Sequence, residues 1–178
     1  MRRLLCPTHL AEQVWHIDLD QLLEGGVRGL ILDLDNTLVD WNAEALRAPV
    51  RAWVEAAQGR GFRVCLVSNS LSGRRVRRVA EALGIGCVTR AGKPFPRAFR
   101  RGLSLLGTGA GETCAIGDQV FTDMLGANLL GLHTVLVSPL SPREPPHTRL
   151  IRHLERPLRR RWRAGGAGLF PGAEEEEK

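Results

Sequence analysis

From residue 27 onward, the hydrophobic pattern alternates regularly between short apolar runs and amphipathic segments. Runs of Val, Ile and Leu with few polar interruptions are typical of strands buried on both faces. The predicted strands span residues 27–35, 62–70, 85–90, 112–118 and 132–140. The segments between them carry apolar residues three and four positions apart, as in helices that pack one face on a sheet. The predicted helices span residues 43–61, 72–84, 96–107 and 120–131.

This alternation predicts a three-layer α/β/α fold of the Rossmann-like type with a mostly parallel sheet. Parallel strands need crossover connections, and helices of this length provide them on both faces of the sheet. Pro49 is expected in the first turn of the helix over 43–61, or at a second start within it, because proline suits that position.

Polar residues gather where the predicted strands end. The group consists of Asp33, Asp35, Ser68, Asn69, Lys93, Asp118 and Asp123. Any one aspartate after a strand can be a helix cap or a turn residue. Open α/β sheets bind their ligands outside the carboxyl ends of the strands. Polar residues at four equivalent places therefore indicate a shared site.

The stretch DLD puts Asp33 and Asp35 on one side of a strand. Two carboxylates a few Å apart repel each other, and their desolvation is unfavourable unless a cation or hydrogen bonds compensate. Mg²⁺ binds one or two carboxylates together with waters and phosphate oxygens. It would offset the repulsion between Asp33, Asp35 and Asp118. One carboxylate of the pair could then attack phosphorus, while the other protonates the leaving oxygen.

Lys93 stands out among the basic residues. The chain has 25 lysine and arginine residues, but lysine occurs only at positions 93 and 178. A compact ammonium suits a single tight contact better than a planar guanidinium does. Lys93 can neutralise charge on a phosphoryl group, and Ser68 can hydrogen-bond to that group.

Four motifs together resemble those of the haloacid dehalogenase (HAD) superfamily of phosphatases. They are DLDNT (33–37), VSNS (67–70), GKP (92–94) and IGDQVFTD (116–123), in the order and on the elements expected for that superfamily. The resemblance implies a HAD-like Rossmannoid fold with Asp33 as nucleophile and Asp35 as general acid and base. It also implies catalytic roles for Ser68 and Lys93.

The same resemblance implies a Mg²⁺ site and a substrate-binding set. The implied metal ligands are Asp33, Asp35 through its backbone carbonyl, and Asp118. Asp123 is implied as a ligand through a water molecule or as a residue that holds the ligands in place. The implied substrate-binding residues are Asn36, Thr37, Asn69 and Ser70. Cap domains of this superfamily are inserted after the first motif or between the second and third. Both places hold only helix-sized stretches here, so we expect no large cap domain and an open site.

A narrower resemblance, to the YqeG-type HAD phosphatases, covers nearly the whole chain. It is carried by HIDLDQLLEGGVRGLILDLDNTLVDWN, GDQVFTDMLGANLLG and the C-terminal LVSPL…HTRLIRHLERPLRRR. That family is related to mitochondrial phosphatidylglycerophosphate phosphatases, and it often has an asparagine where Ser70 stands. The resemblance implies a Mg²⁺-dependent phosphomonoester hydrolase that forms an aspartyl-phosphate, with phosphatidylglycerophosphate as its substrate. The alternatives are a phosphatase of a soluble sugar phosphate or nucleotide, and a vestigial binding protein that docks on RNA or the ribosome.

Composition favours a cytosolic globular protein. The chain has 178 residues, of which 43% are hydrophobic, and its apolar runs are too short for a transmembrane helix. The first residues lack the apolar core of a signal peptide. The four cysteines are scattered without a CxxC pair, so neither a disulfide framework nor a zinc site is expected. The predicted location is the cytoplasm. Peripheral contact with the inner membrane surface is a further expectation.

The net charge of +6 belongs to the C-terminal region. Residues 143–163 contain eight arginines and two glutamates, and the remainder is balanced. Within this region Leu150, Ile151, Leu154, Leu158 and Trp162 follow a helical spacing, which Pro157 is expected to break or kink. Such a helix can close the fold on the sheet or bind an anionic membrane. Nucleic acid is a less favoured partner, because the domain is neutral and poor in aromatic residues.

The predicted organisation has four parts. A lead-in segment spans residues 1–26 and a HAD-like phosphatase core spans 27–140. A basic C-terminal segment spans 141–173, and an acidic tail, expected to be disordered, spans 174–178.

Overall fold

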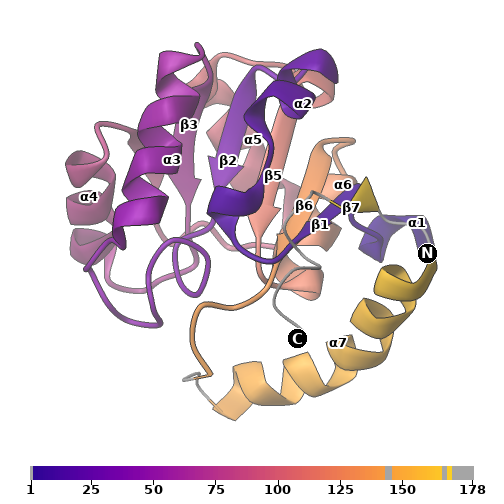
Figure 1. Cartoon of the computed structure of the whole chain (residues 1–178). Helices are drawn as coiled ribbons and strands as arrows, with labels where there is room; N and C mark the ends of the chain where they lie inside the picture. Colours follow the sequence, from indigo (N-terminus) through magenta and orange to yellow (C-terminus); the bar gives the residue numbers. More distant parts are fainter. Residues whose placement is uncertain (1, 143–145, 166–167, 170–178) are drawn as a thin grey trace.

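The computed structural model describes residues 2–142, 146–165 and 168–169 (Figure 1). The predicted acidic tail at 174–178 lies outside these residues. The strands are β1 (His9–Ala11), β2 (Gly29–Leu32), β3 (Arg63–Val67), β4 (Gly86–Val88), β5 (Thr113–Gly117), β6 (His133–Val137) and β7 (Gly168–Leu169). The helices are α1 (Arg2–Leu5), α2 (Leu19–Glu24), α3 (Ala48–Gly59), α4 (Gly73–Ala82), α5 (Pro96–Leu106), α6 (Leu125–Asn128) and α7 (Pro146–Gly165).

The strands form one sheet in the order β4-β3-β2-β5-β6-β1-β7, and every pair of neighbours in it is parallel. Strand β2 is buried along its whole length between β3 and β5. Its last residue, Leu32, is level with Leu66 of β3 and Ile116 of β5, so these three strands end together. The predicted parallel α/β fold is confirmed.

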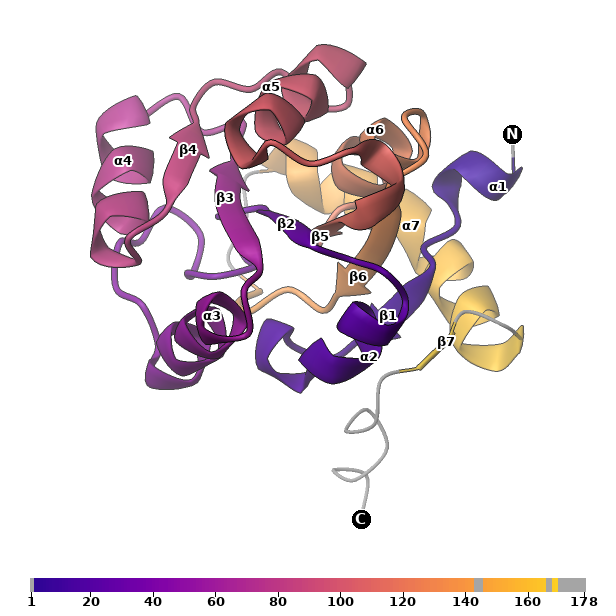
Figure 2. The ribbon, with the colours of Figure 1, turned by 90° about the horizontal axis from the view of Figure 1, so that it is seen from above.

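The two faces of β2 point into two hydrophobic cores. Leu30 and Leu32 belong to the core that includes residues of α2, α3 and α4, whereas Ile31 belongs to the core with α5. Alternate residues of a strand lie on opposite faces, so an unbroken apolar run fills both layers. Figure 2 shows α3 and α5 on opposite sides of the sheet.

Local signals set the helix boundaries. The carboxylate of Asp18 caps α2 by accepting hydrogen bonds from the backbone N–H groups of Asp20 and Gln21, at 2.9 and 3.1 Å. Pro49 lies in the first turn of α3, as the sequence predicted. The helix predicted over 43–61 begins later in the structure, since α3 spans Ala48–Gly59. The region predicted as one helix over 120–131 begins as a π-helical turn (Val120–Met124) and continues as α6.

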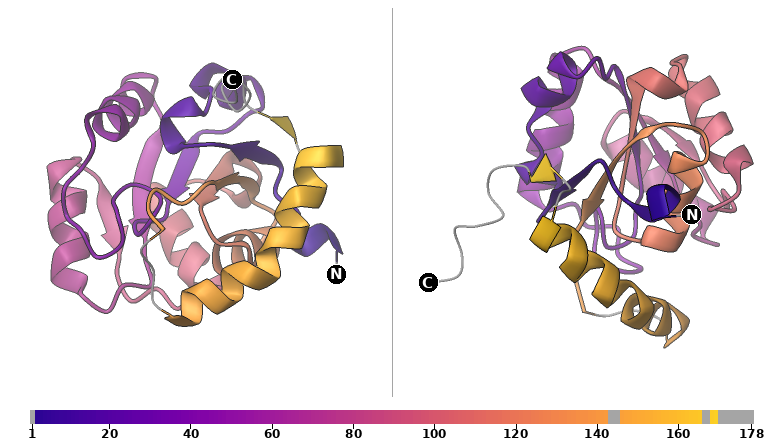
Figure 3. Two further views of the ribbon diagram at one scale, coloured as in Figure 1. Left: turned by 60° about the horizontal axis from the view of Figure 1, so that its bottom comes forward. Right: turned by 90° about the vertical axis from the view of Figure 1, so that its right-hand side faces the viewer.

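The C-terminal helix α7 runs through Pro157 without a break. A proline inside a helix removes one backbone hydrogen bond. In α7 this hydrogen bond is missing on an exposed part of the helix. Leu158 and Trp162 pack against a small core with Leu10, Val120 and Leu136. Figure 3 shows α7 running across one side of the molecule. The segment therefore packs on the domain, one of the alternatives that the sequence leaves open, and a break at Pro157 is not observed.

In the part of the chain that the structure describes, no additional domain is inserted after β2 or between β3 and β5, and all four cysteines are free thiols. The connection from β2 to α3 is a loop, and α4 and β4 follow β3 directly. Among the described helices, none has the length and apolar character needed to span a bilayer.

Candidate active site

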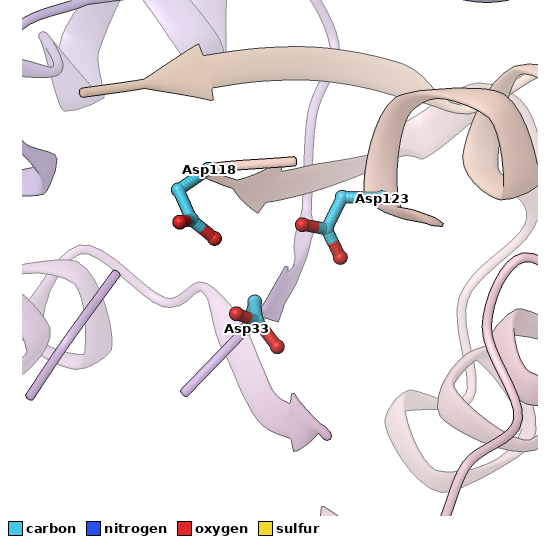
Figure 4. A group of neighbouring side chains, drawn as sticks. All are labelled: Asp33, Asp118 and Asp123. Carbon is cyan, nitrogen blue, oxygen red and sulfur yellow. The ribbon is translucent and has the colours of Figure 1, made fainter. Parts of the chain in front are cut away.

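Three aspartates converge at the carboxyl edge of the sheet. Asp33 follows β2, Asp118 follows the neighbouring β5, and Asp123 lies on the π-helical turn. One carboxylate oxygen of each lies within 4.8 Å of the others, and all three residues are buried. Figure 4 shows their side chains pointing toward one another. Gly117 makes this approach possible, because a Cβ there would lie 2.4 Å from the carboxylate carbon of Asp123.

Lys93 supplies a positive charge between two of these aspartates. Its Nζ lies 2.6 Å from Oδ1 of Asp33 and 2.6 Å from Oδ1 of Asp123. The backbone of Lys93 is fixed by Asn69, whose Oδ1 accepts from the lysine N–H at 2.7 Å and whose Nδ2 donates to the lysine carbonyl at 2.9 Å. The ammonium is thus aimed at the aspartates from a loop that Asn69 holds in place.

Burial changes the proton affinity of the cluster. Burial raises the pKa of Asp33 to about 7 and that of Asp118 to about 6, against the opposing charges of Lys93 and Arg152 respectively. Burial also raises the pKa of Asp123. For Lys93, burial alone would lower the pKa, but the charges of Asp123 and Asp33 raise it above its ordinary value overall. The cluster therefore holds a cationic lysine beside carboxylates whose ionised form is destabilised by burial.

This cluster predicts a specific pH dependence of stability without metal. Between the unfolded pKa of an aspartate, about 3.9, and the folded value of Asp33, the folded state binds a proton that the unfolded state does not. The free energy of unfolding should therefore fall as the pH rises from about 4 to about 7. Asp33→Asn lacks this titration. Urea unfolding of both proteins in chelator across this range checks the difference, and parallel pH profiles would refute it.

The carboxylate of Asp35 is not a member of the three-aspartate cluster. Its Oδ2 lies 2.5 Å from an Nη of Arg75, and its Oδ1 accepts the backbone N–H of Asn42 at 2.9 Å. Arg75 is buried and also donates to Ser70 Oγ at 3.0 Å and to the carbonyl of Ala43 at 2.8 Å. The sequence expectation that one cation offsets Asp33, Asp35 and Asp118 together needs correction for the side chain of Asp35, since Arg75 balances it separately.

The predicted site residues surround one pocket of about 580 Å³. Those that line it are Asp33, Asp35, Asn36, Ser68, Asn69, Ser70 and Lys93. Thr37 is buried and its hydroxyl donates to Oδ1 of Asp118 at 3.4 Å. Asn36 is in the left-handed region (φ 62°), which asparagine tolerates, and this turns the chain at the end of the DLDN stretch. All ten predicted residues are thus brought into or beside the same pocket.

Helix α7 contributes residues that the sequence did not predict for the site. Arg152 forms an ion pair with the carboxylate of Asp118 and donates to its carbonyl at 3.0 Å, and Arg159 donates to the same carbonyl. Glu155 is 1% exposed and accepts the backbone N–H groups of Val120, at 2.7 Å, and Phe121, at 3.3 Å. Burial raises the pKa of Glu155. Polar contacts therefore fasten α7 to the segment that carries Asp118 and Asp123.

Removing the Glu155 carboxylate should loosen this attachment. Glu155→Ala leaves two backbone donors without their acceptor, and we expect the free energy of unfolding to fall by about 1–3 kcal/mol. Glu155→Gln keeps one acceptor oxygen and should lose clearly less. Chemical denaturation of the two variants beside the wild type checks this, and equal losses would contradict it.

The donor set fits a divalent cation. Three buried carboxylates within 4.8 Å provide the hard oxygen ligands that Mg²⁺ prefers. A metal ion there would neutralise part of the negative charge that Lys93 and Arg152 balance in this structure.

Comparisons with known proteins agree with this geometry. A sequence profile described as haloacid dehalogenase-like hydrolase matches residues 41–131. The chain is 36% identical over 88% of its length to "Probable phosphatase YqeG" of Bacillus subtilis (strain 168), covering 90% of that protein.

More distant relatives are similar either in sequence over most of the chain or in fold alone. "Phosphatidylglycerophosphate phosphatase 1, chloroplastic/mitochondrial" of Arabidopsis thaliana is 28% identical over 90% of the chain, which spans 49% of the plant protein. Among solved structures, the magnesium-bound putative HAD-hydrolase YfnB from Bacillus subtilis superposes on 74% of this chain and 98% of its own. The TM-score is 0.50 at 15% identity, which supports the fold alone.

Proposed function

Because this chain belongs to the haloacid dehalogenase-like hydrolases, we propose that it is a Mg²⁺-dependent phosphatase that works through a phosphorylated Asp33. The observation that carries the proposal is the Lys93 ammonium, held 2.6 Å from both Asp33 and Asp123 in a pocket open at the carboxyl edge. Buried acidic groups and the buried Lys93 are suited to phosphoryl transfer, which depends on positioning and charge stabilisation.

Asp33 is the nucleophile in this proposal. A carboxylate oxygen of Asp33 attacks phosphorus, the bond from phosphorus to the leaving oxygen breaks, and an aspartyl-phosphate forms. Asp35 gives its proton to the leaving oxygen and afterwards takes a proton from the water that attacks the aspartyl-phosphate. Inorganic phosphate leaves and both aspartates return to their starting states. Arg75 holds the Asp35 carboxylate in place through the ion pair at 2.5 Å.

The remaining residues bind and orient the phosphoryl group. Lys93 neutralises charge that builds up on its oxygens, and the Ser68 hydroxyl hydrogen-bonds to it. Asn36, Thr37, Asn69 and Ser70 form the proposed substrate-binding set. Asn69 also positions Lys93 through the two hydrogen bonds to its backbone.

Asp33 and Asp118 would hold the metal ion, together with the backbone carbonyl of Asp35 and with Asp123 acting through water or indirectly. When bound, Mg²⁺ supplies positive charge that stabilises the phosphoryl oxygens and offsets repulsion between the substrate and the aspartates.

Phosphatidylglycerophosphate is the substrate that we propose. Support comes from the similarity to the Arabidopsis protein of that name and from a pocket that no cap domain covers in the described chain. The arginines of α7 provide a means of peripheral contact with an anionic membrane. Flotation with anionic vesicles at physiological salt tests that contact, and failure to bind would count against it.

A phosphatase screen with Mg²⁺ and with chelator tests the proposed function. It should include phosphatidylglycerophosphate in detergent micelles, sugar phosphates and nucleotides. We expect Mg²⁺-dependent release of phosphate with the lipid as the preferred substrate. Preference for a soluble compound would replace the lipid assignment, and no activity on any compound would reject the phosphatase proposal.

A further inference from the structure

A second pocket lies between α7 and the segment that follows β6. Its volume is about 580 Å³, and Arg152, His153, Arg156 and Arg159 of α7 line it together with two prolines and a serine. Among the described residues, none of those lining this pocket is acidic. We call it the arginine pocket.

Helix α7 contributes residues to the arginine pocket and to the pocket of the candidate active site. Ile151 lines the pocket of the aspartates, and the next residue, Arg152, lines the arginine pocket while it contacts Asp118. On the opposite wall, the backbone N–H of Leu140 donates to the carbonyl of Asn36 at 3.0 Å. Both walls of the arginine pocket are therefore anchored to loops that carry active-site residues.

The arginines of this pocket have different partners. Arg152 and Arg159 hold the backbone of Asp118, which fixes their guanidinium groups beside the site. Arg156 is exposed, and within the described chain no hydrogen bond or ion pair to its guanidinium is found. Arg152 faces the carboxylate of Asp118 and Arg159 that of Glu155, so among the described residues Arg156 carries the unbalanced positive charge of the pocket. Its guanidinium fork matches two oxygens of a phosphate.

We infer that the arginine pocket binds a second phosphate group, carried by the same substrate molecule whose terminal phosphoryl group is removed at Asp33. This inference rests on the proposed function and narrows its substrate class to compounds with two phosphate groups. A phosphodiester in a lipid head group and a second phosphate of a soluble compound offer the same oxygens to Arg156. Recognition is therefore independent of the acyl chains.

Three substrates and two variants test this inference with the full-length protein and Mg²⁺. The substrates are p-nitrophenyl phosphate, glycerophosphoglycerol phosphate, and phosphatidylglycerophosphate in micelles. Arg156→Ala should lower kcat/KM for the two larger substrates, relative to p-nitrophenyl phosphate, by about tenfold or more, because a charge-assisted contact is lost. The matched control is Arg160→Ala, which removes an exposed arginine of the same helix outside the pocket. It should change kcat/KM for the soluble glycerophosphoglycerol phosphate, relative to p-nitrophenyl phosphate, by less than about twofold.

The other outcomes overturn the inference in distinct ways. An equal loss on all three substrates assigns Arg156 to the fold or to general catalysis. A loss confined to the micellar lipid assigns it to the lipid surface, and an equal effect of Arg160→Ala assigns it to overall charge. If the wild type hydrolyses none of the three, the proposed function fails, and calorimetry with glycerophosphoglycerol then tests the pocket alone. Binding that Arg156→Ala weakens about tenfold or more upholds the pocket, whereas equal or absent binding rejects it.

Discussion

The Asp33→Asn variant is expected to lose phosphatase activity by a factor on the order of 10³ or more, as is usual when a nucleophile is removed. The amide of asparagine cannot form the acyl phosphate, so the two-step route is closed. The fold should survive, since the amide has the size of the carboxylate and leaves Lys93 paired with Asp123. Initial rates on p-nitrophenyl phosphate with saturating Mg²⁺ measure the loss, and circular dichroism checks the fold.

Asp20→Asn is the matched control for this experiment. Asp20 lies on α2, and its exposed carboxylate pairs with Arg60 at 2.9 Å. The same chemical change there should leave kcat and KM close to those of the wild type, because exposed ion pairs contribute little. If Asp33→Asn is as active as the wild type and as Asp20→Asn, Asp33 is not the nucleophile.

Removal of divalent metal should lower activity by a comparable factor. Without the ion, the substrate phosphate meets three buried carboxylates, which among the described residues are balanced by Lys93, Arg152 and the more weakly acting Arg159. Mg²⁺ should also raise the unfolding temperature in the absence of substrate, because a ligand that binds only the folded state stabilises it. At 100 times its dissociation constant the gain is about 2.7 kcal/mol.

Asp118→Asn distinguishes a bound metal from a general salt effect. We expect this variant to lose most of the Mg²⁺-induced shift in unfolding temperature, whereas Asp20→Asn keeps it. Rates that are the same in Mg²⁺ and in chelator, together with no thermal shift in the wild type, would show that the aspartates serve without a metal ion.

The sequence predicted the central strands because their pattern leaves little choice. β2 and β5 are buried along their whole length, which is typical of strands in the interior of a parallel sheet. Once that topology is assumed, Asp33 and Asp118 must meet at one edge, and the structure places them within 4.8 Å. The convergence of the predicted site residues thus follows from strand order, without any knowledge of side-chain contacts.

The features that the sequence did not predict depend on contacts between distant segments. Arg75 lies on a helix rich in arginine, and nothing in the local pattern distinguishes it from its exposed neighbours. Its burial is set by Asp35, 40 positions earlier in the chain. β1 has three residues, too few for a period to be detected.

Glu155 illustrates the same limit in the basic segment. The segment was interpreted from its apolar stripe and its arginines, and both features are present in α7. A glutamate between arginines is typical of a solvated helix face, yet this one is buried against the N–H groups of Val120 and Phe121. The position of Glu155 at the edge of the apolar stripe is the signal that the sequence contains. It indicates burial only once the segment with Val120 and Phe121 is known to face it.

Trapping the covalent intermediate tests the central claim most directly. Sodium borohydride reduces an acyl phosphate to the alcohol, so an aspartyl-phosphate at position 33 is converted to homoserine, which peptide mass spectrometry locates. We predict homoserine at position 33 when substrate and Mg²⁺ are both present, and aspartate there when either is omitted. Turnover with position 33 unmodified, or with the modification at another aspartate, would contradict the account.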